Sequence, residues 1–225
     1  MWDDLLPALQ NHTCIAIDLH GHGDSFYDDS LTPSIELMAK QVKAVLESLS
    51  IGPYIVVGHS LGGYVANELL KTDPAVEHIV LFHSHPWADS ESKKKDRDRV
   101  IELVKTKARS FIREAIPNLF AQPEKHPEAI ETYCAMAEEM PPAAIGWSAA
   151  AMRDRSDYAS LLQEKAGQVT IVQGQLDPII PNLKLHAFAK EAGINWHEIA
   201  GCGHMSQAEA TEEAMEILKV IMNEQ

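Results

Sequence analysis

Short apolar runs alternate along this chain with longer segments in which apolar residues recur every three or four positions. The runs at 54–57, 77–82 and 169–173 are mostly apolar, as in strands buried on both faces of a parallel sheet. Further strands are predicted at 13–18 and 195–199. Helical spacing predicts helices at 34–49, 61–70, 183–192 and 209–222. This alternation is typical of an α/β fold with a mainly parallel sheet.

The pattern of residue types changes after residue 85. From 88 to about 163 the chain is charged, rich in Ala and Met, and helical in pattern, with breaks at several prolines. We interpret residues 86–163 as a helical insertion of four or five short helices, a lid between two parts of one core, 1–85 and 164–225. The insertion stands between two core strands, where a lid over the carboxyl edge of the sheet would lie.

A serine in the sequence Gly58-His59-Ser60-Leu61-Gly62 stands at the junction of a predicted buried strand and a predicted helix. This G-x-S-x-G pattern is typical of a sharp strand-to-helix turn that lifts a serine hydroxyl above the sheet. Glycines suit the turn because its strained backbone leaves no room for neighbouring Cβ atoms. The N–H of Leu61 would then point toward an oxyanion formed beside Ser60. The alternative is a tight glycine-rich turn with an inert serine.

Two further residues could activate that serine. A serine hydroxyl is a good nucleophile only when a base takes its proton, and the base needs an orienting carboxylate. Asp177 follows the strand at 169–173, and His204 lies between the last strand and the last helix. Hydrolases with this turn carry serine, acid and histidine in that order, each just after a core strand. Ser60, Asp177 and His204 are therefore predicted as a catalytic triad, against the alternatives of a turn-forming aspartate and a polar loop histidine.

Other histidines, aromatic residues and methionines are candidates for a pocket or a metal site. His83 and His85 form an H-x-H pair after a strand, but no third ligand has suitable spacing, so a pocket-edge or plain loop role is favoured over a metal. The insertion contributes methionines and a tryptophan that pack the lid or line the pocket. No metal and no cofactor are predicted. The residues predicted to line the substrate pocket are His59, His85, Trp147 and Met205.

Acidic residues outnumber basic ones by 33 to 19, which gives a net charge of −14. This charge disfavours binding to nucleic acid or to an anionic membrane, and no apolar run approaches the roughly 18 residues that a membrane span needs. The three cysteines are far apart and form no C-x-x-C pair, which disfavours disulfides and zinc and favours the cytoplasm. A small-molecule acyl substrate, rather than nucleic acid or membrane, is the expected partner.

Four stretches together resemble the α/β-hydrolase superfamily, in its small-esterase and enol-lactonase-like branch. They are DLHGHGDS (18–25), VVGHSLGG (56–63), VQGQLDPIIP (172–181) and GCGHMSQAE (201–209). The resemblance implies Ser60 as nucleophile, His204 as general base and then acid, Asp177 as its orienting carboxylate, and the Leu61 N–H as one oxyanion donor. Serine rather than aspartate at position 60 disfavours dehalogenase and epoxide hydrolase chemistry.

The resemblance also implies strands that precede the present sequence. Members of the superfamily begin with two or three further strands and an HG-type loop that supplies the second oxyanion N–H, whereas residues 1–6 resemble the helix after that loop. We favour the interpretation that this sequence derives from a longer natural protein. We expect a reduced sheet of about five strands, with an edge that is exposed, covered by a second copy in a homodimer, or closed by the segment 13–18. Loss of an oxyanion donor costs about 100- to 1000-fold in turnover, so weak or absent activity is expected.

Three functions stay open on the sequence. The first is a serine hydrolase that cleaves a small carboxylic ester, thioester or lactone through an acyl-enzyme on Ser60. The second is a cofactor-free lyase or carbon–carbon bond hydrolase that uses the same triad for acid–base chemistry. The third is a non-catalytic binding module of the same fold. The presence of Ser60, Asp177 and His204 argues against the third.

Overall fold

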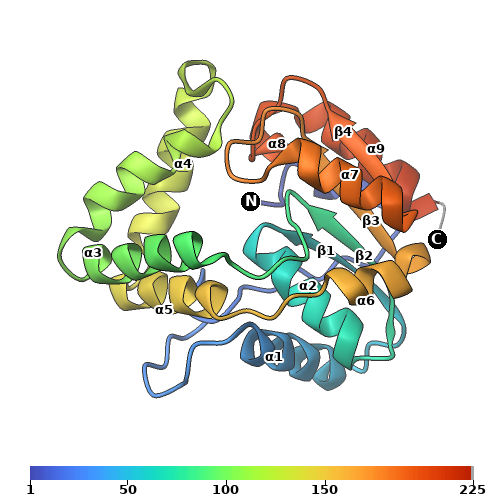
Figure 1. The fold of residues 1–225 in the computed structure, drawn as a ribbon, viewed down its shortest axis with the longest axis horizontal. Helices are drawn as coiled ribbons and strands as arrows, with labels where there is room; N and C mark the ends of the chain where they lie inside the picture. Colours follow the sequence, from blue (N-terminus) through green and yellow to red (C-terminus); the bar gives the residue numbers. More distant parts are fainter. Residues whose placement is uncertain (224–225) are drawn as a thin grey trace.

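A parallel sheet flanked by helices forms the centre of the protein, and a separate group of helices lies at one end (Figure 1). The computed structural model describes residues 1–223, apart from the side chain of Ala8. Neighbouring strands are all parallel and follow the order β1-β2-β3-β4. The strands are β1 (Tyr54–His59), β2 (Val76–Phe82), β3 (Val169–Gly174) and β4 (Asn195–Ile199).

Helices connect the strands and make up the insertion. Those around the sheet are α1 (Ile35–Ser48), α2 (Leu61–Thr72), α6 (Ala159–Glu164), α7 (Asn182–Ala192), α8 (Ser206–Glu209) and α9 (Thr211–Asn223). Those of the group at one end are α3 (Glu91–Ala115), α4 (Pro127–Glu138) and α5 (Pro142–Arg153). Short 3-10 turns are η1 (Leu6–Leu9), η2 (Pro117–Leu119), η3 (Pro123–Lys125) and η4 (Ala166–Gln168). Within residues 1–223, no helix is both long and apolar enough to cross a membrane.

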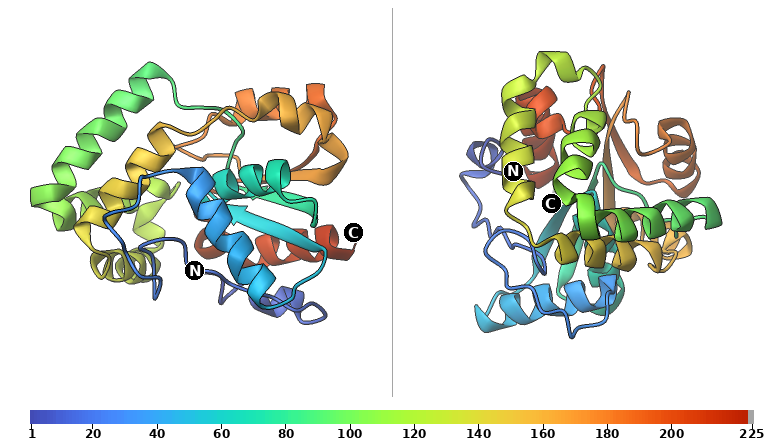
Figure 2. Two further views of the ribbon diagram at one scale, coloured as in Figure 1. Left: turned by 90° about the horizontal axis from the view of Figure 1, so that it is seen from below. Right: turned by 90° about the vertical axis from the view of Figure 1, so that its left-hand side faces the viewer.

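Alternate residues of β2 divide the core between the two faces of the sheet. Ile79 and Leu81 pack with α1, α2 and α7, whereas Val80 and Phe82 pack with α9. Figure 2, seen from below, shows α1 in front of the strands and α9 behind them. Successive side chains of a strand point to opposite faces, so a strand covered on both faces is apolar at nearly every position. This confirms the buried strands that the sequence predicted at 77–82 and 169–173.

The prolines of the insertion mark where its helices begin. Helices η2, α4 and α5 begin at Pro117, Pro127 and Pro142. Proline is tolerated there because the N–H groups of the first helical turn have no acceptor within the helix. α3 is longer than the short helices expected, at 25 residues, and it bends at Lys107, whose φ of −135° is not helical. The group α3–α5 lies beside the sheet (Figure 1), and both α5 and α6 contribute to the core, α5 through Trp147 and Ala151 and α6 through Leu162. The boundaries of the insertion at 86 and 163 stay a prediction.

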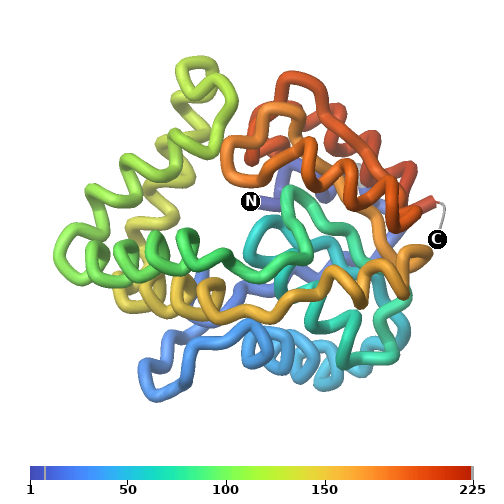
Figure 3. The backbone as a smooth tube through the Cα atoms, viewed as in Figure 1, coloured from blue at the N-terminus to red at the C-terminus, as the bar shows by residue number. Residues whose placement is uncertain are grey.

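The strand predicted at 13–18 is not formed. These residues make no strand pairing, and residues 13–16 are exposed, so the sheet has four strands rather than about five. β1 is therefore an edge of the sheet, and 13–18 does not close against it. A β-rich segment becomes a strand only where a neighbour supplies partners for its backbone groups; at the surface, water supplies them instead. Trp2 nonetheless lies near the carboxyl end of β2, because its ring centroid is 5.9 Å from that of Phe82. Figure 3 traces these first residues in blue from the N-terminus.

Candidate functional site

Ser60 alone forms the turn between β1, which ends at His59, and α2, which begins at Leu61. Its backbone has φ 50° and ψ −111°, a conformation that costs energy for a residue with a Cβ and that recurs at functional sites. The Ser60 N–H donates to Phe82 O, and the Gly63 N–H donates to Ser60 O, each at 3.0 Å. The turn has the sharp strand-to-helix geometry that the sequence predicted.

Only one of the two glycines in the G-x-S-x-G pattern stands where a Cβ atom would not fit. A Cβ added to Gly58 would lie 2.4 Å from Gly62 O, which is closer than Cβ atoms come to backbone. A Cβ added to Gly62 would meet nothing within 4 Å. The glycine that follows this pattern, Gly63, is also crowded, because an added Cβ would meet the side chain of Ser84. The expectation that the turn leaves no room for a Cβ is therefore right for Gly58 and wrong for Gly62.

Gly58→Ala is expected to lower the free energy of unfolding by about 3 kcal/mol, because the new methyl group must push backbone atoms apart. Gly62→Ala is the matched control, and its expected effect is below about 1 kcal/mol because alanine is a better helix former than glycine. Urea unfolding of both variants measures the difference. Equal destabilisation by the two substitutions would contradict the steric argument.

Asp177 and His204 meet at the carboxyl edge of the sheet, in the loops that follow β3 and β4. His204 Nδ1 lies 2.7 Å from Asp177 Oδ2, and the two side chains are 3% and 0% exposed. The other carboxylate oxygen, Oδ1, accepts the N–H groups of Ile179 and Ile180 at 2.8 and 3.0 Å. Backbone donors thus hold the carboxylate, which in turn orients the imidazole through Nδ1 and leaves Nε2 free for acid–base work.

The charge of Asp177 is stabilised by its surroundings. Burial by itself would raise the pKa of this carboxyl, but the hydrogen bonds from His204 and from the Ile180 N–H outweigh burial and hold the pKa far below its ordinary value. Asp177 is therefore ionised throughout the neutral range. An ionised, oriented carboxylate can stabilise the imidazolium that forms when His204 accepts a proton.

The serine turn and the histidine loop touch through the residue before the serine. His59 Nε2 lies 2.9 Å from the carbonyl oxygen of His204, and the two rings are 5.1 Å apart between centroids. Burial, with His204 and His83 close by, lowers the pKa of His59 well below its ordinary value, so the neutral ring donates its Nε2–H to that carbonyl. Among the described residues the Ser60 hydroxyl has no hydrogen-bond partner. Serine–histidine bonds of this kind often tighten only when substrate binds.

The other residues proposed for the oxyanion and the pocket lie as follows. The N–H of Leu61 belongs to the first turn of α2, where it has no acceptor within the helix. His85 Nε2 lies 3.2 Å from Tyr64 Oη, and burial lowers the pKa of His85 to about 3. The indole of Trp147 is buried in the core and donates to a backbone carbonyl, and Met205 is buried beside His204. Their roles toward a substrate stay predictions.

One functional candidate was missed by the sequence analysis. The carboxylate of Glu209 accepts the N–H groups of Gly203 and Met205, each at 3.1 Å, on the two sides of His204. Charge-assisted bonds to backbone N–H groups are strong and fix a loop in one conformation. The spacing of GHMSQAE places Glu209 five residues after His204, but that pattern by itself reads as an ordinary helix residue.

The insertion also contacts the histidine loop directly. Glu209 accepts the N–H of Ala121 at 2.8 Å, and the N–H of His204 donates to Leu119 O at 2.8 Å. A Cβ added to Gly203 would lie 2.5 Å from the nitrogen of Ala121, so the loop and the insertion approach as closely as a glycine allows. The chain between η2 and η3 therefore takes part in placing the backbone of His204.

His83, Asp177 and His204 place ligating atoms within 4.8 Å of one another, so the third ligand that the sequence lacked for His83 exists in space. These atoms already have partners, however. His204 Nδ1 and Asp177 Oδ2 bond to each other, and the N–H of Gly174 donates to His83 Nδ1 at 3.2 Å. A zinc ion would need these bonds broken so that each ligand lay about 2.0–2.2 Å from the metal. The cluster fits an acid–base pair better than a metal site.

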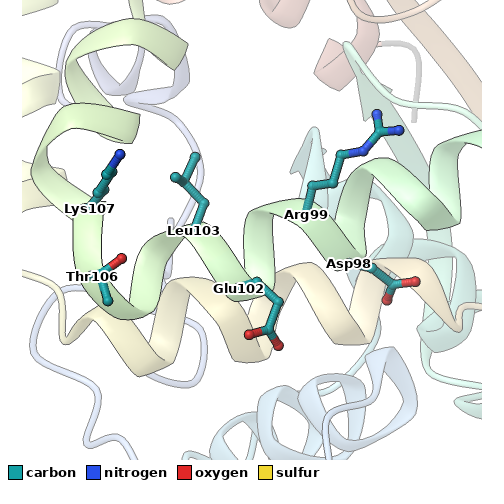
Figure 4. A pocket seen from close by; sticks show the side chains of 6 residues that line it. All are labelled: Asp98, Arg99, Glu102, Leu103, Thr106 and Lys107. Carbon is teal, nitrogen blue, oxygen red and sulfur yellow. The ribbon is translucent and has the colours of Figure 1, made fainter.

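A hollow of about 580 Å³ lies along α3 (Figure 4). None of the three predicted triad residues lines it, so it is not assigned to the candidate active site. The side chains that line it are Asp98, Arg99, Glu102, Leu103, Thr106 and Lys107.

Comparison with known proteins extends the similarity beyond these residues. A thermophilic esterase from Thermogutta terrifontis, solved with malate bound, has 27% identity and a TM-score of 0.85 over 92% of this chain and 78% of that chain. A putative esterase/lipase from Haemophilus influenzae is 32% identical over 34% of this chain and 26% of its own length. The acetyltransferase component of an acetoin cleaving system from Cupriavidus necator is 27% identical over 96% of this chain and 58% of its own length.

The chain thus spans between about a quarter and three fifths of the length of these two curated relatives. The family as a whole is matched over a much larger part of the present sequence. A profile described as alpha/beta hydrolase family matches residues 1–215. The fold and the order of the motifs agree with that match, and the chain belongs to the alpha/beta hydrolase family.

Proposed function

We propose that this chain is a serine hydrolase that cleaves a small carboxylic ester, thioester or lactone through an acyl-enzyme on Ser60. The observation that carries the proposal is the buried bond of 2.7 Å between His204 and Asp177, next to a serine held on a strained turn. A histidine held through Nδ1 presents Nε2 as a base. Relatives named as esterases support the same class of reaction.

The reaction follows from these positions. Ser60 Oγ attacks the carbonyl carbon of the substrate while His204 Nε2 takes the hydroxyl proton. The Leu61 N–H donates to the oxyanion that forms on the carbonyl oxygen. The bond to the leaving oxygen or sulfur then breaks as His204 returns the proton to that atom, which leaves an ester of Ser60. Water, deprotonated by His204, attacks this ester, and Ser60 recovers its proton as the acid departs. Asp177 stays ionised throughout.

The acidity of the chain bears on the substrate. A net charge of −14 repels polyanionic substrates, so a small neutral acyl compound is the class that we propose.

A fluorophosphonate probe tests the proposal, because it phosphonylates only serines activated by a base. Mass spectrometry of the labelled peptides is expected to find the label on Ser60 in the folded chain and nowhere in a heat-denatured control. A panel of p-nitrophenyl esters measures turnover in parallel. A folded chain that is not labelled at Ser60 would overturn the proposal, whereas weak ester turnover alone would not.

A further inference from the structure

Asp177 Oδ2 faces two imidazole rings rather than one. His204 Nδ1 lies 2.7 Å from this oxygen, and His83 Nδ1 lies 3.4 Å from it. His83 is 0% exposed and has no part in the reaction proposed above. Its φ of 50° lies in the left-handed region, as does that of Ser60. A residue with a Cβ keeps such a conformation only where its surroundings hold it in place.

The contacts of His83 join the segments that carry the site. Its backbone N–H donates to Val172 O at 2.8 Å, which extends the pairing of β2 with β3. The N–H of Gly174, at the end of β3, donates to Nδ1 at 3.2 Å. On the other side of the ring, Nε2 lies 2.7 Å from Ser206 Oγ, two residues after His204. One side chain thus bridges the aspartate loop and the histidine loop.

These contacts select one tautomer of His83. The N–H of Gly174 is directed at Nδ1, so Nδ1 is the acceptor and the proton of the neutral ring lies on Nε2, which donates it to Ser206 Oγ. Burial lowers the pKa of His83, which keeps the ring neutral. The ionisable groups around it are Asp177, His59, His204 and Glu209. Nδ1 therefore presents a lone pair to Asp177 Oδ2, and of the two rings only His204 donates a proton to that oxygen.

We propose that His83 is a positioning residue: bonded to Gly174 and Ser206, it fixes the aspartate and histidine loops against each other and keeps Asp177 Oδ2 for His204 alone. This rests on the proposed function of the same site. The other tautomer, or a protonated ring, would place an N–H beside Oδ2 and divide the carboxylate between two donors. His204 would then be held less firmly, and small displacements of a catalytic group cost large factors in rate.

Two substitutions and a matched control test the proposal kinetically. His83→Phe removes both polar contacts and is expected to lower kcat on p-nitrophenyl esters about 10- to 100-fold. The expected change in KM is less than about threefold, since His83 contacts no substrate. His83→Asn retains an acceptor near the position of Nδ1 for the N–H of Gly174 but loses the bond to Ser206, so its kcat is expected to lie between those of the wild type and His83→Phe. His78→Asn is the control, a buried histidine on the same strand that bonds Thr170 instead, and should lower the melting temperature without changing kcat.

Nuclear magnetic resonance of protein labelled with ¹⁵N-histidine gives a second readout. His83 is expected as the Nε2–H tautomer, and the His204 Nδ1–H proton is expected at low field in the wild type and His83→Asn, but broadened or absent in His83→Phe. An Nδ1–H tautomer of His83 would overturn the proposal. So would a His83→Phe variant with unchanged kcat and low-field proton and only a lower melting temperature. If the wild type shows neither ester turnover nor labelling of Ser60, the proposed hydrolase function fails, whereas the two resonances still decide whether His83 positions the pair.

Discussion

Replacement of Ser60 by alanine is expected to lower kcat/KM for p-nitrophenyl esters on the order of 10⁴- to 10⁶-fold, because no other group can form the acyl intermediate. Stability should change by less than about 1 kcal/mol, since the hydroxyl has no hydrogen-bond partner among the described residues and alanine keeps the Cβ of the strained turn. Ester assays, fluorophosphonate labelling and urea unfolding of the same preparation measure these effects separately.

Ser48→Ala serves as the control for Ser60→Ala. Ser48 lies at the end of α1, where its hydroxyl donates to a backbone carbonyl on the surface. This variant should retain both turnover and labelling. Residual ester hydrolysis in Ser60→Ala at the wild-type rate would show that another residue, or another protein in the preparation, performs the reaction.

Asp177→Asn is expected to lower kcat/KM about 10⁴-fold. The asparagine amide can fill the same space, but it can turn an NH₂ group toward His204 Nδ1, which moves the imidazole proton to Nε2, the atom that must accept the proton of Ser60. Ester assays across the neutral range check the loss. A fall of less than about tenfold would indicate that His204 is oriented mainly by its N–H bond to Leu119 O and by the bonds of Gly203 and Met205 to Glu209, rather than by Asp177.

The same variant carries an expectation for acid stability. The pKa of Asp177 is depressed in the folded protein, so below the ordinary carboxyl pKa the unfolded chain binds more protons than the folded one. Its stabilising contribution is complete above about pH 5 and is lost progressively as the pH falls toward the folded value. Urea unfolding of wild type and Asp177→Asn should therefore converge on acidification. Parallel curves down to about pH 3 would contradict this assignment.

The neutral buried histidines add a loss of stability on acidification that both proteins share. Burial lowers the pKa of His59, His78 and His83, so they stay neutral in the fold while the unfolded chain takes up protons below about pH 6.5. The difference between the two unfolding curves cancels the contribution of His78, whose pKa is lowered by burial alone, and reports Asp177 together with its effect on His59 and His83.

Local patterns predicted those elements whose causes are local. The helix expected at 34–49 forms as α1, and the Ser34 hydroxyl accepts the N–H of Leu37 at 3.0 Å as its cap. The turn at Ser60 likewise follows from a glycine pattern between a strand and a helix. Capping, helical periodicity and turn geometry depend on residues within a few positions of one another, so a linear sequence contains them.

Local patterns could not predict pairing between segments that are distant in the sequence. Residues 13–18 have strand-forming composition but find no neighbour, and the need for a glycine at position 58 rather than 62 depends on how the helix folds back over the strand. Strand propensity describes how well side chains pack on a sheet surface. It does not determine whether a neighbouring strand is present to form that surface.

Residue types and their order along the chain were enough to select Ser60, Asp177 and His204 as candidates, because this chemistry needs a hydroxyl, a carboxylate and an imidazole, each after a core strand. Only the tertiary structure brought His83 and Glu209 to the same two loops. Their contacts depend on which parallel strands are neighbours and on where the insertion rests, and both are set by packing between segments far apart in the chain.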